Sequence, residues 1–139
     1  MNISRYGHQV TLVATLLGLA ACGGGGSQLQ VDDINKLTKL SQVMEAQANL
    51  ADPQFKKRDQ QTFTDAEFAT FADVGTRLQA TALKAKTFSK GEGFDALATG
   101  VHDRAAELVT AAQAKDAAAA RKALTEMKAT CKECHKKYR

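Results

Sequence analysis

The final segment of the chain, residues 117–138, carries the pattern that most constrains the fold. Its apolar and sulfur-bearing side chains recur at alternating steps of three and four residues, which is the spacing of one face of an α-helix. This stripe consists of Ala117, Ala120, Leu124, Met127, Cys131, Cys134 and Tyr138. Two cysteines are therefore part of an apolar helix face, and the chain must bury that face against other helices.

Three further segments also predict helices. The region after residue 30 is rich in alanine and nearly free of β-branched runs, a composition that favours helix. We expect helices at about 31–50, ending before Pro53, and at about 65–87 and 92–114. Thr64 and Glu67 form a capping-box pattern before the second of these, and Asp116 is placed to cap the final helix.

All four segments are amphipathic and most are joined by short connections, so the sequence predicts an all-α, antiparallel four-helix bundle. The longer connection at 51–63 carries Phe55 and Phe63, which we expect to fold back over one end of the core. Small residues dominate the apolar stripes, so something large must fill the space between the helices. The other predicted inward positions are Ile34, Leu37, Leu40 (or Ser41), Met44, Ala48, Phe68, Phe71, Gly75, Leu78, Ala82, Phe94, Leu97, Val101, Ala105, Leu108 and Ala112.

The chain ends in CKECHKKYR, and C-x-x-C-H is typical of the attachment site of c-type haem. The i, i+3 spacing places the Cys131 and Cys134 sulfurs on one helix face, where both can form thioethers with the two vinyl groups of a porphyrin. His135 follows directly and supplies a nitrogen ligand for the iron. Only four residues come after His135, so the upstream helices have to cover such a haem.

Two other interpretations of the cysteine pair stay open at this point. A structural zinc site needs four ligands, and beyond Cys131, Cys134 and His135 the chain offers only His102 and carboxylates. A thioredoxin-like dithiol requires a βαβ context, which the pattern does not predict.

The pattern Cys131-Lys132-x-Cys134-His135-x-x-Tyr138-Arg139 at the end of a helical domain resembles the class II cytochromes c, the cytochrome c prime group. The resemblance implies a four-helix bundle with one covalent haem c on its last helix. It implies that His135 is the proximal iron ligand and that Arg139 lies near the haem. Members of this family are often homodimers.

The same resemblance makes the distal face of the iron decisive for function. Family members with a methionine on the first helix are six-coordinate electron carriers, whereas members with an apolar residue there bind gases such as nitric oxide or carbon monoxide. Met44 on the inward stripe favours a His/Met-ligated electron carrier, because a thioether is a soft ligand that favours ferrous iron. The alternative places Leu40 over five-coordinate iron. We expect Met127 to pack against the haem edge and His102 to lie at the surface.

The N-terminus indicates export. Residues 1–21 have the length and apolar run of a secretory signal, and Leu19-Ala20-Ala21-Cys22 resembles the lipobox of bacterial lipoproteins. We expect Cys22 to carry lipid, residues 22–30 to form a Gly-rich tether, and residues 31–139 to form the cytochrome domain. The chain has three cysteines, and the assignment of one to lipid and two to haem leaves no cysteine without a role.

The charge pattern gives expectations about partners. Lys128, Lys132, Lys136, Lys137 and Arg139 surround the C-terminal motif and could steer an acidic redox protein toward it. We expect membrane attachment only through the lipid, on the periplasmic side and most simply at the outer membrane, and no binding of nucleic acid. The sequence shows no catalytic base, nucleophile or substrate pocket, so we do not expect an enzyme.

Overall fold

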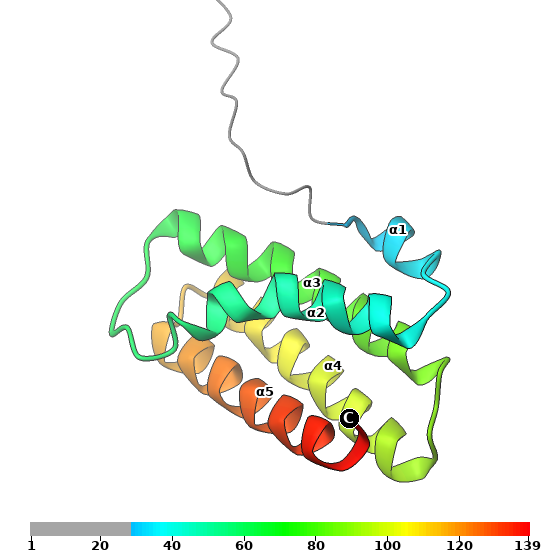
Figure 1. Cartoon of the computed structure of the whole chain (residues 1–139). Coiled ribbons are helices and arrows are strands. Elements are labelled where there is room, and N and C mark those ends of the chain that lie inside the picture. The colour runs from blue at the N-terminus through cyan, green and yellow to red at the C-terminus, as the bar shows by residue number, and fades with distance from the viewer. Residues whose placement is uncertain (1–28) are drawn as a thin grey trace, which may run out of the picture.

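The computed structural model describes residues 29–139, which form helices and contain no β-strand (Figure 1). Consecutive long helices run antiparallel, which confirms the predicted all-α, four-helix bundle. A short additional helix precedes them. The helices are α1 (Val31–Asn35), α2 (Leu40–Phe55), α3 (Asp65–Lys86), α4 (Glu92–Gln113) and α5 (Ala117–Tyr138).

The capping residues define where the long helices begin. The Thr64 hydroxyl accepts a hydrogen bond from the Glu67 N–H (3.2 Å), and the Glu67 carboxylate accepts one from the Thr64 N–H (2.9 Å). Asp116 accepts a hydrogen bond from the Ala119 N–H at the start of α5. These contacts satisfy N–H groups that have no partner within the helix, so the predicted capping box and cap are confirmed.

The predicted first helix, about 31–50, begins at Val31 as expected, but its continuity and its end were wrong. The chain breaks between α1 and α2, and the Gln42 side-chain oxygen accepts hydrogen bonds from the N–H groups of Thr38 and Lys39, which fixes the new start. Helix α2 also continues past Pro53 to Phe55. Because Gln54 and Phe55 are buried, their packing holds the last turn helical despite the N–H that proline lacks.

The end of the bundle that holds the α2–α3 connection is closed by aromatic side chains; we call it the closed end. Phe63 meets Phe68 and Phe71 edge-on, with ring centroids 5.7 and 4.9 Å apart. This geometry suits the ring quadrupoles and fills the space beside the small residues of α4 and α5. Phe63 packs against this end of the core as predicted, whereas Phe55 is the last residue of α2 rather than part of the connection, and it is buried in the same cluster. The small buried residues of the same cluster include Ala111, Ala112, Ala120 and Ala123.

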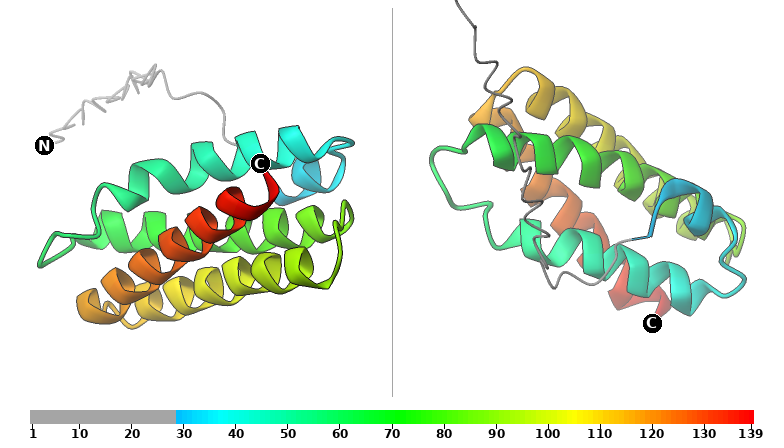
Figure 2. Two further views of the ribbon diagram at one scale, coloured as in Figure 1. Left: turned by 60° about the horizontal axis from the view of Figure 1, so that its bottom comes forward. Right: turned by 90° about the horizontal axis from the view of Figure 1, so that it is seen from above.

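Helices α3 and α4 pack along their lengths, as do α4 and α5, whereas α2 and α5 meet only sparsely. Figure 2 shows α2 running lengthwise beside α3, with α5 approaching it obliquely. The pair α2 and α5 is therefore the place where the bundle has room for another group.

Helix α1 is attached to α3. Ile34 is fully buried, and the Lys84 ammonium donates a hydrogen bond to the Asn35 carbonyl at 2.8 Å. Among the helices of residues 29–139, none combines the length and apolar character needed to cross a bilayer. The predicted signal at residues 1–21, lipidated Cys22 and most of the tether lie outside the described residues.

Candidate functional site

A cavity of about 690 Å³ lies between α2 and α5, with α3 and α4 behind it. Its size is in the range of sites for drug-sized ligands and cofactors. Apolar side chains form the inner wall, with Leu78 from α3, Val101 from α4 and Met127 from α5. Met127 is fully buried, as expected for a side chain packed behind the site. We call this half of the bundle the open end.

The C-terminal motif faces this cavity. Cys131, Cys134 and His135 all line it, since the stripe of α5 points toward α2. Both cysteines are free and half-buried, while His135 is exposed. The sequence therefore located the three residues correctly on one face, and their donor set of two thiols and one imidazole fits a covalently attached haem.

The surroundings keep both thiols protonated. Burial raises the pKa of Cys131 to about 11, and the nearby Cys134 and the carboxylate of Asp52 add to this rise. Burial also raises the pKa of Cys134, although the positive charge of Lys90 acts in the opposite direction. A reactive dithiol requires the reverse shift, because the thiolate is the nucleophile. The surroundings therefore do not favour the dithiol interpretation.

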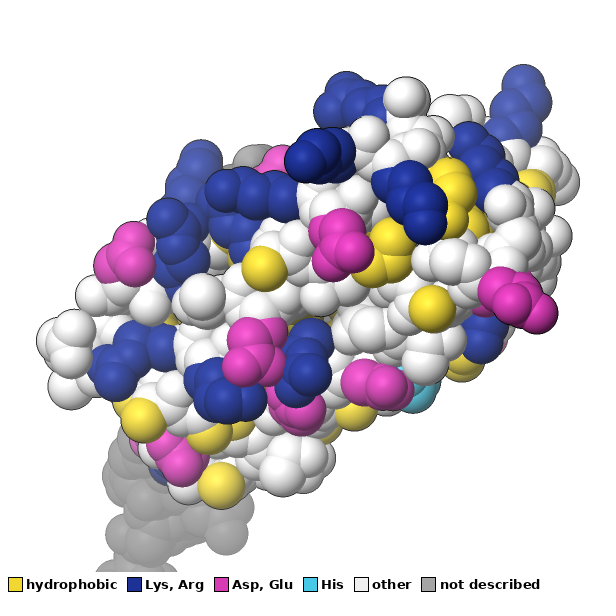
Figure 3. All heavy atoms as spheres, turned by 90° about the horizontal axis from the view of Figure 1, so that it is seen from below, with side chains coloured by type: hydrophobic (Ala, Val, Ile, Leu, Met, Phe, Trp, Pro, Cys, Tyr) yellow, Lys and Arg dark blue, Asp and Glu magenta, His cyan; other side chains and the backbone are white. Residues whose placement is uncertain are grey.

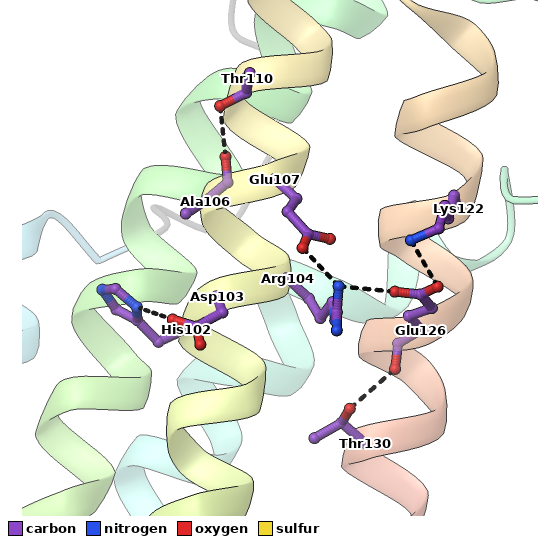
Figure 4. Close-up of polar contacts among 9 residues, drawn as sticks. All are labelled: His102, Asp103, Arg104, Ala106, Glu107, Thr110, Lys122, Glu126 and Thr130. Carbon is purple, nitrogen blue, oxygen red and sulfur yellow. Dashed lines mark hydrogen bonds and ion pairs between the residues drawn. The ribbon is translucent and has the colours of Figure 1, made fainter.

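The zinc interpretation receives no support from the geometry either. Within residues 29–139, no group of three or more His, Cys, Asp or Glu side chains is arranged to hold a metal ion. A tetrahedral zinc site needs four converging ligands. His102 lies on α4 beside Asp103, with its Nδ1 3.0 Å from the Asp103 carboxylate, and does not line the cavity (Figure 4).

Both candidates for the distal position lie on α2. Leu40, the first residue of the helix, and Met44, one turn further, line the cavity. Met44 also borders a small adjoining pocket that it shares with Cys131, Cys134 and His135, a pocket that Leu40 does not reach. Of the two residues, Met44 therefore borders both of the pockets that His135 lines, whereas Leu40 borders only the larger one.

The end of α5 is fixed against the start of α4. The Tyr138 ring meets Phe94 edge-on, with centroids 5.4 Å apart, and a side chain at Gly93 would collide with the Tyr138 hydroxyl. Arg139 lines the cavity together with Tyr138. Near the middle of the two helices, Arg104 of α4 contacts Glu107 and also Glu126 of α5, the latter at 2.9 Å (Figure 4).

Three charged residues of the cavity wall were not singled out from the sequence. Glu45 and Asp52 come from α2, and Lys90 comes from the connection between α3 and α4. Asp52 could have been found, because Met44, Ala48 and Asp52 follow each other at four-residue steps on one helix face. Lys90 could not, since only tertiary structure brings that connection to the cavity.

Lysines and arginines gather on the face that includes α5. Figure 3 shows this face from below, where basic side chains outnumber acidic ones. The Lys128 ammonium lies 5.5 Å from the centre of the Phe55 ring, so this basic residue of α5 lies beside the cavity wall formed by α2. A cation in this position is held by the aromatic face.

Comparison with known proteins identifies one family. The family model described as Cytochrome C' matches residues 32–139, which is the whole of the helical domain. No curated protein and no solved structure matches this chain.

Proposed function

Because the chain belongs to the cytochrome c′ family, whose cofactor is covalently attached haem c, we propose that it is a periplasmic one-electron carrier with His/Met-ligated iron. The observation that carries the proposal is the position of Met44, which shares the small pocket of Cys131, Cys134 and His135. When bound, haem c supplies an iron that exchanges one electron between its ferric and ferrous states.

The chain's own residues have distinct roles in this proposal. The thiols of Cys131 and Cys134 hold the cofactor through thioethers, and the His135 imidazole ligates the iron from the same helix. The Met44 sulfur supplies the opposite ligand, and thioether ligation favours the ferrous state. The apolar wall, which includes Leu78 and Val101, keeps water from the inner side of the site. Arg139 lies at the outer edge.

An absorption spectrum tests the ligation. We expect low-spin ferric iron with a thioether-to-iron charge-transfer band, and we expect Met44→Ala to abolish that band and to open the iron to carbon monoxide. Leu40→Ala is the matched control, since it shortens a neighbouring side chain of the same wall and should leave the band unchanged. An unaltered spectrum in Met44→Ala would exclude ligation by Met44.

The alternative function is a gas-binding cytochrome with five-coordinate iron. Its support is that Leu40 also lines the cavity, at the turn of α2 that precedes Met44. In that case the wild-type protein has high-spin iron and binds carbon monoxide readily, and Leu40→Ala changes the affinity for the gas while Met44→Ala changes it less. Neither function gives the chain a catalytic role toward a substrate, so we propose that it is not an enzyme.

We further propose that residues 1–21 are a lipoprotein signal and that Cys22 carries the lipid, which holds the domain at the periplasmic side of the outer membrane. A lipid anchor of this kind is firm because more than one acyl chain is present. Cys22→Ser should move the cytochrome from the membrane fraction to the soluble periplasmic fraction. Persistence of the variant in washed membranes would contradict the anchor.

The basic residues of α5 support an acidic redox partner. Lys128, Lys132 and Lys136 follow one another at four-residue steps on α5, and their positive charges can steer a negatively charged protein toward the C-terminal motif. Electron transfer to such a partner should slow as salt is added, because exposed charges are screened. The triple change of these lysines to glutamine should remove most of that salt dependence.

We also expect a homodimer, as in many members of the family. Analytical ultracentrifugation would test this expectation by measuring the mass of the protein in solution.

A further inference from the structure

Lys90 projects into the cavity from a tightly defined turn between α3 and α4. The Ser89 hydroxyl accepts a hydrogen bond from the Gly91 N–H, and Gly91 has a φ of 106°, which other residues rarely adopt. The Lys90 ammonium donates a hydrogen bond to the carbonyl of Tyr138 at 3.1 Å. The turn therefore directs this lysine across to the end of α5.

In this position the Lys90 ammonium can bind a second group in addition to the Tyr138 carbonyl. The last carbonyls of a helix carry partial negative charge, which attracts an ammonium group. An ammonium has three donors, and the Tyr138 carbonyl takes one of them. Lys90 is exposed, so its remaining donors are available to a group in the cavity.

The charges of the cavity wall are separated by element. The described wall has acidic residues only on α2, where Glu45 and Asp52 lie, and its Lys and Arg residues are Lys90 and Arg139, both near the end of α5. Haem c brings two propionate groups as well as a largely apolar ring. A carboxylate that leaves water needs a charged or hydrogen-bonding partner, and the α2 wall repels it.

We propose that Lys90 binds a propionate of the haem and thereby raises the reduction potential of the iron, an inference that rests on the proposed attachment at Cys131 and Cys134. The ammonium offsets the negative charge of the propionate. Without this offset, the negative charge of the propionate stabilises ferric iron more strongly than it does when Lys90 is present, and the reduction potential is lower. Lys90 is in this sense a positioning residue that tunes the cofactor without touching the iron.

Three variants separate the propionate contact of Lys90 from a general effect of positive charge on the potential: Lys90→Gln, Lys90→Arg and Lys136→Gln. Lys136 is next to His135 in the sequence, yet it does not line the cavity, so Lys136→Gln removes the same charge without the contact. Spectroelectrochemistry gives the potential of each variant. The propionate bending mode in resonance Raman spectra reports whether the propionate keeps its hydrogen bond.

For Lys90→Gln we expect the ferrous-to-ferric ratio at a fixed potential to fall about threefold, the order expected for one charge in a partly aqueous site, equal to about 28 mV for a one-electron couple. The Raman mode should shift in Lys90→Gln alone, and Lys90→Arg should restore both readouts. Equal potentials in Lys90→Gln and Lys136→Gln, or an unshifted Raman mode in Lys90→Gln, would overturn the proposal. A wild-type protein without covalent haem would instead overturn the proposed function.

Discussion

The two ends of this bundle solve the same packing problem in opposite ways. At the closed end, α4 and α5 present small residues, and Phe63, Phe68 and Phe71 fill the space beside them. At the open end, small residues such as Ala48 and Ala51 line the cavity from α2. Phe55, Phe94 and Tyr138 lie on the cavity wall without filling the space, which has a volume of about 690 Å³. The closed end gives the fold its stability, and the open end gives it a binding site.

The largest expected effect is the loss of covalent haem attachment at the open end. Replacing both Cys131 and Cys134 with serine should abolish covalent haem, because among residues 29–139 these two are the cysteines that line the cavity. Haem staining of a denaturing gel measures this, and Cys22→Ser is the matched control that should keep the stain. Covalent haem in the double variant would show that the attachment assigned to α5 is wrong.

The next effect concerns the closed end. Phe71 is fully buried, and Phe71→Ala should cost about 3–5 kcal/mol of the free energy of unfolding, through lost burial and the cavity left behind. Urea unfolding measures the change. Phe88 is half-buried and lies outside the closed end, so Phe88→Ala should lower the free energy of unfolding much less than Phe71→Ala. A similar loss in both variants would remove the distinction between the two ends.

The third change tests whether the open end serves binding more than stability. Met44→Leu conserves volume and should cost less than about 1.5 kcal/mol. It should nevertheless remove the thioether-to-iron band, since leucine cannot ligate. Comparing urea unfolding with the absorption spectrum separates the two effects. A variant that keeps its band but loses stability would assign Met44 to the core alone.

A smaller effect is expected at the start of α3, beside the closed end. Thr64→Ala removes the side-chain acceptor of the capping box and should cost about 1 kcal/mol. Thr76→Ala is the control: this exposed threonine only donates to the Ala72 carbonyl within the helix. Thermal unfolding of the two variants should therefore differ, and equal midpoints would contradict the assigned cap.

The smallest effect is a pH dependence of the same cap. The backbone N–H of Thr64, and then Lys57, hold the pKa of Glu67 below its usual 4.5. Because the folded-state pKa is the lower one, the stabilisation is present above pH 4.5 and is lost as the pH falls through the folded-state value. Glu67→Gln should flatten this acid-side loss in unfolding curves between pH 6 and 3. An identical slope in both proteins would contradict it.

The sequence predicted the long helices best where local signals and the apolar stripe agreed. The predicted range of the last helix matches α5, because Asp116 marks its start and its stripe has no gap. The same stripe includes Cys131 and Cys134, which line the cavity together with the adjacent His135. The first helix was predicted poorly for two reasons. The local cap that Gln42 makes to Thr38 and Lys39 was overlooked, and the packing that carries α2 past Pro53 depends on tertiary contacts.

The charged wall of the cavity shows the limit of pattern reading. Periodicity relates residues of one helix, so it could link Asp52 to Met44. It has no means of relating Lys90 to Tyr138, 48 positions later, because that contact depends on how the turn after α3 meets the end of α5.

The attachment of α1 to α3 has a mechanical consequence. A force applied to the chain at residue 30 acts first on the burial of Ile34 and on the hydrogen bond between Lys84 and Asn35. The load passes first into α3, which is packed along α4 and also contacts α2. Because the helix is interrupted after Asn35, a pull on residue 30 reaches the helix that bears Met44 by way of α3 as well as along the chain.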